Sequence, residues 1–254
     1  MRNFILFGFF FFFVLCTTAK TFLFIGDSIT DGNWGNPSKY PCSSEERNLW
    51  DKNHILGHGY VEMIAGYYGG EYPDSDYNFI NRGISGETLS QIALRWDKDV
   101  INNHPDEITL LCGTNDVHYW LETKPEEIGE FDFHAYMSVL DSIINITINK
   151  FPDIRINLAT PFAAKAGKIK NHPNINLRIA TVDSISTLIK EFINTTNNQN
   201  IFLIDFNHLL NELKEDNSNI DYWMWDGIHP TTPMHYRMAK YYIQNHLPIK
   251  YTGR

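Results

Sequence analysis

Four short stretches of the chain carry the residue types that acyl transfer requires. The stretch GDSITDG places Ser28 directly after an apolar run, and CGTNDV places Asn115 after another. The stretch WDGIHP supplies Asp226 and, three positions later, His229. A fourth, NRGISGET, offers glycines whose backbone is accessible. A serine hydroxyl is a weak nucleophile until an adjacent base takes its proton, so the set as a whole indicates attack on an acyl group.

Each stretch alone also fits ordinary loop structure. Gly-Asp-Ser ends a strand and caps a helix, Gly-Thr-Asn-Asp fits a tight turn, and His-Pro is common where a helix begins. The elements that position these stretches must therefore carry part of the inference.

Strand-like and helix-like runs alternate along the chain. The patterns predict strands over residues 21–26, 77–83, 107–113, 154–160 and 201–205. They predict helices over residues 59–68, 88–103, 133–150, 174–193 and 233–247. This order is typical of an α/β fold, a single-domain three-layer α/β/α sandwich with a five-stranded parallel sheet. Sites in such sheets form at the carboxyl ends of the strands, where three of the stretches fall, and WDGIHP lies in the last loop before the C-terminal helix.

The bulk composition restricts the class of partner. The chain has 254 residues, 43% of them hydrophobic, which is enough for one domain with a buried core. The formal net charge of −9 argues against nucleic acid or an anionic membrane surface as the main partner.

The first 19 residues have the pattern of a secretory signal peptide. Arg2 precedes an apolar core from Phe4 to Leu15, and Thr17 and Ala19 are the small residues that a peptidase prefers. We expect a signal peptide over 1–19, a domain over 20–254, a secreted or lumenal protein and no stable membrane span after cleavage. An uncleaved membrane anchor is the alternative, although the apolar core is shorter than the roughly 20 residues of a span.

Cleavage would leave Cys42 and Cys112, whose pairing the sequence leaves open. Asn145 and Asn194 head sequons that fit glycosylation of a secreted protein.

The four stretches together resemble the conserved blocks of the SGNH hydrolases, also called GDSL esterases, in the order of that family. The likeness runs from about Thr21 to about Leu247 and implies the SGNH/flavodoxin-like form of the fold. It implies Ser28 as nucleophile, His229 as base and Asp226 as the group that orients the imidazole. It also implies an oxyanion hole formed by the N–H groups of Ser28 and Gly83 and the amide of Asn115. Neither a metal nor a cofactor is needed.

Other interpretations of the same residues are weaker. Ser85 lacks a complete G-x-S-x-G elbow because Glu87 replaces its last glycine, so a turn-capping role is favoured. Asp27, Asp31 and Asp116 suit a glycosidase pair, although the resemblance makes them supports of the loops. His54 and His58 are one turn of a possible helix, a weak metal signal.

Within the family, the chain looks most like bacterial carbohydrate acetyl esterases, including acetylxylan esterases. Trp34, Trp120 and Trp225 fall near the proposed site and are candidates for stacking on a sugar. We expect an acetylated carbohydrate substrate; a lysophospholipase-like or broad short-chain lipid esterase and a catalytically idle glycan-binding protein are the alternatives. The segment from Asn33 to Leu56 is expected to lie over the pocket and reshape it.

Overall fold

Five parallel strands form the centre of the structure, in the order β2-β1-β3-β4-β5. The computed structural model describes residues 19–39, 41–122, 129–216 and 219–245. The strands are β1 (Thr21–Gly26), β2 (Asn78–Gly83), β3 (Glu107–Leu111), β4 (Arg155–Ala159) and β5 (Ile201–Ile204). Each lies within a run predicted as a strand, so the five-stranded parallel sheet is confirmed.

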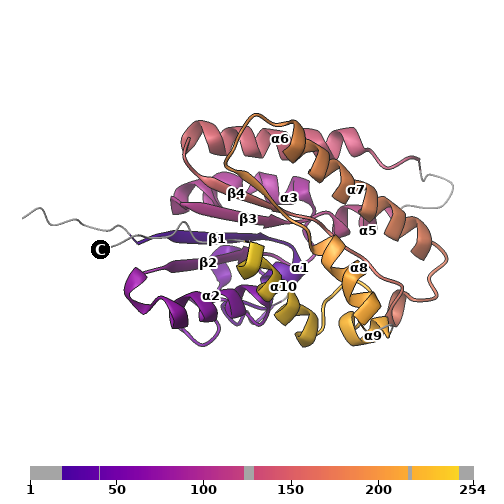
Figure 1. The fold of residues 1–254 in the computed structure, drawn as a ribbon, viewed down its shortest axis with the longest axis horizontal. Helices are drawn as coiled ribbons and strands as arrows, with labels where there is room; N and C mark the ends of the chain where they lie inside the picture. Colours follow the sequence, from indigo (N-terminus) through magenta and orange to yellow (C-terminus); the bar gives the residue numbers. More distant parts are fainter. Residues whose placement is uncertain (1–18, 40, 123–128, 217–218, 246–254) are drawn as a thin grey trace, which may run out of the picture.

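Helices cover both faces of this sheet (Figure 1). One face carries α3 (Leu89–Leu94), α4 (Trp96–Asp99), α5 (Thr114–Glu122), α6 (Phe133–Lys150) and α7 (Ile175–Thr195). The other carries α2 (Tyr60–Glu71), α8 (Phe206–Asp216), α9 (Ile220–Trp223) and α10 (Thr232–Asn245). The short α1 (Ser28–Asp31) follows β1, and 3₁₀ turns occupy η1 (Ser44–Glu46), η2 (Pro73–Ser75), η3 (Ile101–Asn103) and η4 (Gly167–Ile169). The three-layer sandwich is thereby confirmed.

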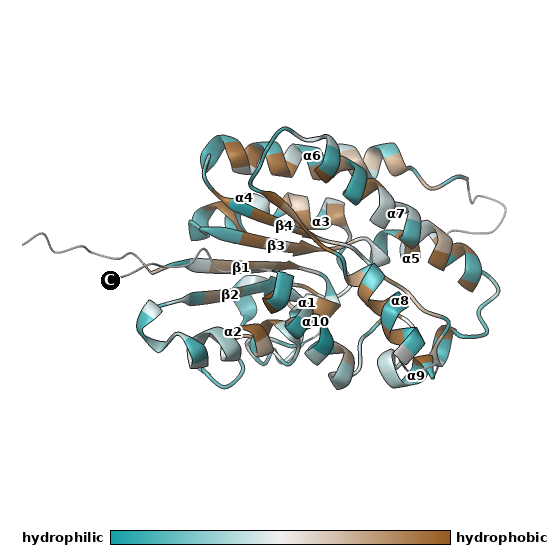
Figure 2. Ribbon diagram, viewed as in Figure 1, coloured by the Kyte–Doolittle hydropathy of each residue, from teal (hydrophilic) through white to brown (hydrophobic). Residues whose placement is uncertain are grey.

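The core lies between the sheet and each helical layer. All five residues of β3 are buried, as expected for a strand covered on both faces. Figure 2 shows hydrophobic and hydrophilic residues alternating around α6 and α7, so each helix presents an apolar stripe to the sheet and a polar one to solvent.

The single helix predicted over residues 88–103 is wrong, because the chain breaks at Arg95. Its backbone there has φ −109° and ψ 10°, outside the helical range. The Arg95 guanidinium binds Glu87 on one side and Asp99 on the other. The break also buries Trp96, whose Nε1 donates to the Thr147 hydroxyl at 2.9 Å.

The helices α5 and α8 and the short α9 lie where no helix was predicted. CGTNDV is predicted to end a strand, yet α5 begins within it at Thr114, immediately after Gly113, whose φ is +131°. The helix α8 follows β5 directly and packs through Phe206, Leu209, Leu210 and Leu213.

The predicted signal peptide lies outside the described residues except for Ala19, and it stays a prediction. Within the described ranges, no helix has the length and apolar character needed to cross a bilayer. Cys42 and Cys112 are both buried and unpaired. Asn145 and Asn194 are exposed on α6 and α7, and their glycosylation is untested.

Candidate active site

The residues singled out for acyl transfer come from separate loops at the carboxyl edge of the sheet. Ser28 is the first residue of α1, directly after β1 and the capping residue Asp27. Asn115 is the second residue of α5, which follows β3. Asp226 and His229 lie in the loop between α9 and α10. The parallel sheet brings these loops together although 201 positions separate Ser28 from His229.

Ser28, His229 and Asp226 form a continuous chain of short contacts. The Ser28 Oγ lies 2.8 Å from His229 Nε2, and His229 Nδ1 lies 2.8 Å from Asp226 Oδ2. The other oxygen of Asp226 accepts from the backbone N–H groups of Ile228 and His229. Such an arrangement allows a histidine to take the serine proton while a carboxylate stabilises the resulting imidazolium.

The electrostatics of Asp226 suit that arrangement. Burial acts to raise its pKa, but the hydrogen bonds from His229 and Ile228 and the charge of His229 together hold the pKa below its usual value. Asp226 therefore stays ionised over the neutral range, and an ionised carboxylate requires His229 Nδ1 to carry the proton. Nε2 is then the nitrogen that faces Ser28.

Asp27 orients the turn that presents Ser28. Its Oδ1 accepts from the Ile29 N–H at 3.0 Å and caps α1. Burial raises the pKa of Asp27 to about 7, against the lowering effect of this hydrogen bond. Asp27 is thus a positioning residue behind Ser28, as the resemblance implied.

His235 makes stability depend on pH. The Tyr60 N–H donates to its Nδ1 at 3.3 Å, and burial, assisted by the charge of His229, lowers the pKa of His235 from 6.5 to about 4. Between these two values only the unfolded chain binds the proton, so stability falls as the pH drops. The loss reaches about 3 kcal/mol by pH 4.

Urea unfolding of the wild type and of His235→Asn at pH 7.5 and 4.5 measures this loss. Asparagine keeps an acceptor for the Tyr60 N–H and does not titrate, so its stability should depend less steeply on pH. Asp27 and Asp116 titrate in the same range, so only the difference between the two proteins is assigned to His235. Equal losses in both proteins would contradict this role.

The predicted contribution of Gly83 to the oxyanion hole needs correction. Its N–H donates to the Oδ1 of buried Asn81 at 2.8 Å, so it is already occupied. A side chain at this position would clash with the backbone of Asp31, which explains the glycine by packing. Among the described residues, none accepts from the N–H of Ser28 or of Gly86.

Asn115 and Gly86 belong to one local structure. Gly86 lies in a turn with φ +82°, a conformation that favours glycine. The next residue, Glu87, accepts from Asn115 Nδ2 through its carbonyl oxygen at 3.1 Å. The amide of Asn115 retains a second N–H, so it is held beside this turn with a donor to spare.

The carboxylates weighed as a glycosidase pair bind other parts of the chain. Asp31 accepts from the N–H and hydroxyl of Ser85 at 2.9 and 3.0 Å. Asp116 accepts from the Leu89 N–H at the start of α3. Ser85 is buried and donates to Asp31, which accords with a turn-capping role.

The three tryptophans proposed to contact substrate have different positions. Trp34 is wrong as a substrate contact: it is 1% exposed, and its Nε1 donates to the Gly83 carbonyl at 2.7 Å. Trp120 is partly buried, donates to the Gly129 carbonyl and packs edge-on against Phe131. Trp225 is 52% exposed and stacks on the His229 ring, with centroids 5.5 Å apart.

The sequence analysis did not single out two residues that lie near the site. Tyr119 is half-exposed, and its hydroxyl lies 3.3 Å from where a Gly86 side chain would begin. The i, i+4 spacing from Asn115 could have placed it on the same face of α5. Arg47 is fully buried against Asp31, and no local pattern distinguishes it from the exposed polar residues around it.

Metal ligands are not gathered in the part of the chain that the structure describes, where no group of three or more His, Cys, Asp or Glu side chains could hold an ion. His54 and His58 lie in an irregular turn rather than a helix, with Nδ1 and Nε2 3.1 Å apart.

Comparison with known proteins gives consistent results. Residues 24–237 match the model of the GDSL-like lipase/acylhydrolase family. An acetylxylan esterase from Geobacillus stearothermophilus is 27% identical over 231 residues, which cover 89% of this chain and 94% of that protein.

Solved structures of Axe2, an acetyl xylan esterase from the same organism, are similar as well. One variant has a TM-score of 0.69 at 28% identity and covers 89% of this chain and 94% of its own. A catalytic mutant of Axe2 has a TM-score of 0.70 at 25% identity, with coverage of 90% and 95%. The family match spans most of the chain and includes all four motif stretches. The chain belongs to the GDSL-like lipase/acylhydrolase family and is a serine ester hydrolase.

Proposed function

We propose that this serine ester hydrolase removes acetyl groups from carbohydrate hydroxyls through Ser28, His229 and Asp226. The observation that carries the proposal is the pair of 2.8 Å contacts joining Ser28 to His229 and His229 to Asp226. Ser28 Oγ attacks the acetyl carbonyl carbon as its proton passes to His229 Nε2. The ester C–O bond then breaks, and His229 returns the proton to the departing sugar oxygen.

The second half of the reaction frees the enzyme. His229 takes a proton from water, the resulting hydroxide attacks the acetyl-Ser28 carbonyl, and acetate leaves as Ser28 regains its proton. Asp226 stays ionised throughout and stabilises the imidazolium, which agrees with the lowered pKa of its carboxyl.

The oxyanion formed in each half is bound by the N–H groups of Ser28 and Gly86 and by the amide of Asn115. Gly86 replaces Gly83 in this proposal because the Gly83 N–H is occupied by Asn81. Three features support Gly86: its N–H has no acceptor in the described chain, its turn has a positive φ, and Asn115 is bonded to the following residue. Fixed donors of this kind need no reorganisation as charge develops.

Acetylated carbohydrate is the substrate class that the surroundings favour. Trp225 and Tyr119 expose aromatic surface close to His229 and Gly86 respectively. Aromatic faces stack well on sugar rings. The relatives described above are named for acting on acetylated xylan, which supports the same class.

Acyl-chain preference tests this proposal. We expect kcat/KM on 4-nitrophenyl esters to be highest for acetate and to fall steeply toward decanoate, with all turnover depending on Ser28. The protein should then release acetate from acetylated xylan. A maximum at longer chains would contradict deacetylation and favour the lipid esterase, and no turnover of any ester by the wild type would favour a binding protein. The matched control is Ser184→Ala, because Ser184 is exposed on α7 and donates only to its own helix.

A further inference from the structure

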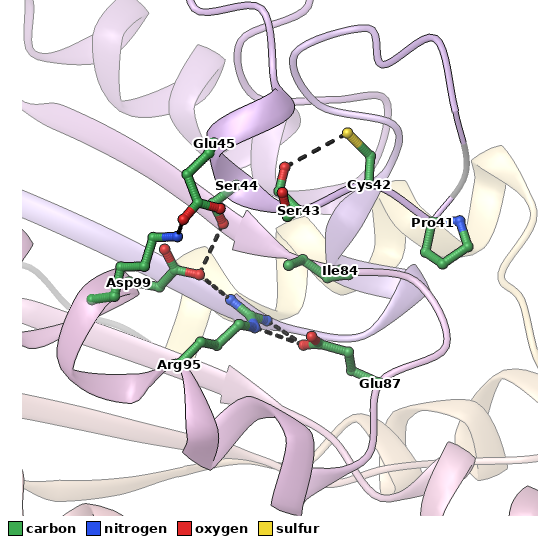
Figure 3. A pocket seen from close by; sticks show the side chains of 10 residues that line it. Pro41, Cys42, Ser43, Ser44, Glu45, Ile84, Glu87, Arg95 and Asp99 are labelled. Atoms are coloured by element: carbon green, nitrogen blue, oxygen red, sulfur yellow. Dashed lines mark hydrogen bonds and ion pairs between the residues drawn. The ribbon is translucent and has the colours of Figure 1, made fainter.

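A cavity of about 330 Å³ is lined by charged, polar and apolar side chains (Figure 3), and Glu87, the residue after Gly86, is one of them. One wall is formed by residues 41–45 of the segment predicted to lie over the site. The facing wall is formed by Arg95, Lys98 and Asp99, and Ile84 and Glu87 lie between the two. We call this cavity the 41–45 pocket.

The turn around Gly86 has the proposed oxyanion hole on one side and the 41–45 pocket on the other. The carbonyl oxygen of Glu87 accepts from Asn115, whereas its carboxylate reaches into the pocket and binds Arg95 at 2.7 Å. The backbone N–H of Ser85 donates to Asp31, the last residue of α1, and Ser28 is the first residue of that helix. The pocket and the proposed oxyanion hole therefore share the turn around Gly86.

The wall formed by residues 41–45 is held in place by the buried side chain of Arg47. Arg47 donates to the Cys42 carbonyl from Nε and Nη2, at 3.2 and 2.9 Å. The same guanidinium binds both carboxylate oxygens of Asp31. Because Asp31 ends α1, the wall and Ser28 are fixed to one another through a single buried ion pair. The pocket is thus pre-formed.

The chemistry of the lining favours a neutral, hydroxyl-rich ligand. Arg95 is paired with Glu87 and Asp99, and Lys98 with Glu45, so most of the charges are already compensated. Ser44 completes the group by donating to Asp99 at 2.8 Å. An acyl tail would have to desolvate these charges without replacing their hydrogen bonds, which is costly. Sugar hydroxyls can donate to the carboxylates and accept from the cations together.

We propose that the 41–45 pocket binds the sugar ring next to the one that carries the acetyl group. This assignment rests on the proposed function and adds to it a preference for oligomeric over monomeric sugars. A bound neighbouring ring holds the acetylated hydroxyl over Ser28, so its effect should be seen mainly in kcat/KM for long substrates.

The test compares acetylated xylotetraose with acetylated methyl xyloside. We expect the wild type to prefer the tetraose by roughly tenfold in kcat/KM, the equivalent of about one or two hydrogen bonds. Ser44→Phe, which places a ring in the cavity, should abolish that preference. Glu45→Ala, at the exposed mouth, should reduce it severalfold and serves if Ser44→Phe does not fold. Ser75→Phe and Glu71→Ala, on the exposed surface outside the pocket, are matched controls and should keep the full preference.

Direct binding separates this proposal from the deacetylation proposal. Calorimetry should detect unacetylated xylotetraose bound to Ser28→Ala, with the binding lost on adding Ser44→Phe. Loss of binding in that variant supports the pocket even if no acetyl sugar is hydrolysed, in which case only the proposed function fails. Hydrolysis of acetylated xylotetraose with an unchanged length preference in Ser44→Phe, or no binding to Ser28→Ala, would overturn the pocket and leave the proposed function standing.

Discussion

Replacing Ser28 with alanine is expected to lower kcat on acetyl esters by roughly 10⁴- to 10⁶-fold. The loss is this large because Ser28 is the hydroxyl that His229 Nε2 contacts, at 2.8 Å, and alanine removes the atom that attacks the ester. Circular dichroism and unfolding should match the wild type, since alanine fits the first position of α1. The measurement is the steady-state rate on 4-nitrophenyl acetate together with mass spectrometry of trapped acetyl-enzyme.

Asn115→Ala gives an intermediate comparison. Removing one oxyanion donor typically costs about 10²- to 10³-fold in kcat, with a smaller change in KM. The order of activity should therefore be wild type and Ser184→Ala, then Asn115→Ala, then Ser28→Ala. Activity of Ser28→Ala within tenfold of the wild type would show that another group is the nucleophile.

Replacing Arg47 with methionine is expected to lower the free energy of unfolding by about 3–5 kcal/mol. Both side chains of the Arg47–Asp31 pair are 0% exposed, and the guanidinium also donates to the carbonyls of Cys42 and Trp34. Methionine leaves the Asp31 carboxylate buried without a countercharge, with only the N–H and hydroxyl donors of Ser85 and the N–H of Asn33 remaining. Chemical denaturation at neutral pH measures the loss.

Two further variants give this prediction its control. Asp31→Asn combined with Arg47→Met removes both charges, so the double variant should recover part of the stability lost in Arg47→Met. Lys170→Met removes an exposed lysine 4.0 Å from Asp221 and should cost only about 0–1 kcal/mol. A loss for Arg47→Met as small as that for Lys170→Met would show that the buried pair does not hold the segment.

Local sequence determined the sheet and the relay of polar groups. The strands follow from short apolar runs bounded by turn residues, because a parallel strand must bury both faces. The capping box at Thr88 is likewise a local feature and is present in the structure. Ser28, Asp226 and His229 could be grouped from the sequence because their stretches resemble the ordered blocks of the SGNH hydrolases, although Asp226 and His229 lie in a loop between two helices.

Only the tertiary structure decided which N–H groups are free to bind the oxyanion and which aromatic rings are exposed to a substrate. Gly83 and Gly86 share one sequence motif, but only the folded chain shows that Asn81 occupies the N–H of Gly83. Trp34 is of a residue type that stacks on sugar rings. In the folded chain, however, the guanidinium groups of Arg47 and Arg82 lie 4.8 and 5.2 Å from its ring and help to bury it.

The same holds for the helix break at Arg95, which places Trp96 against Thr147, and for the 41–45 pocket, in which Lys98 pairs with Glu45, since both contacts join segments that are distant in the sequence. Periodicity records which face of an element is apolar. It does not record which buried charge will meet its partner, because that depends on how remote segments pack together.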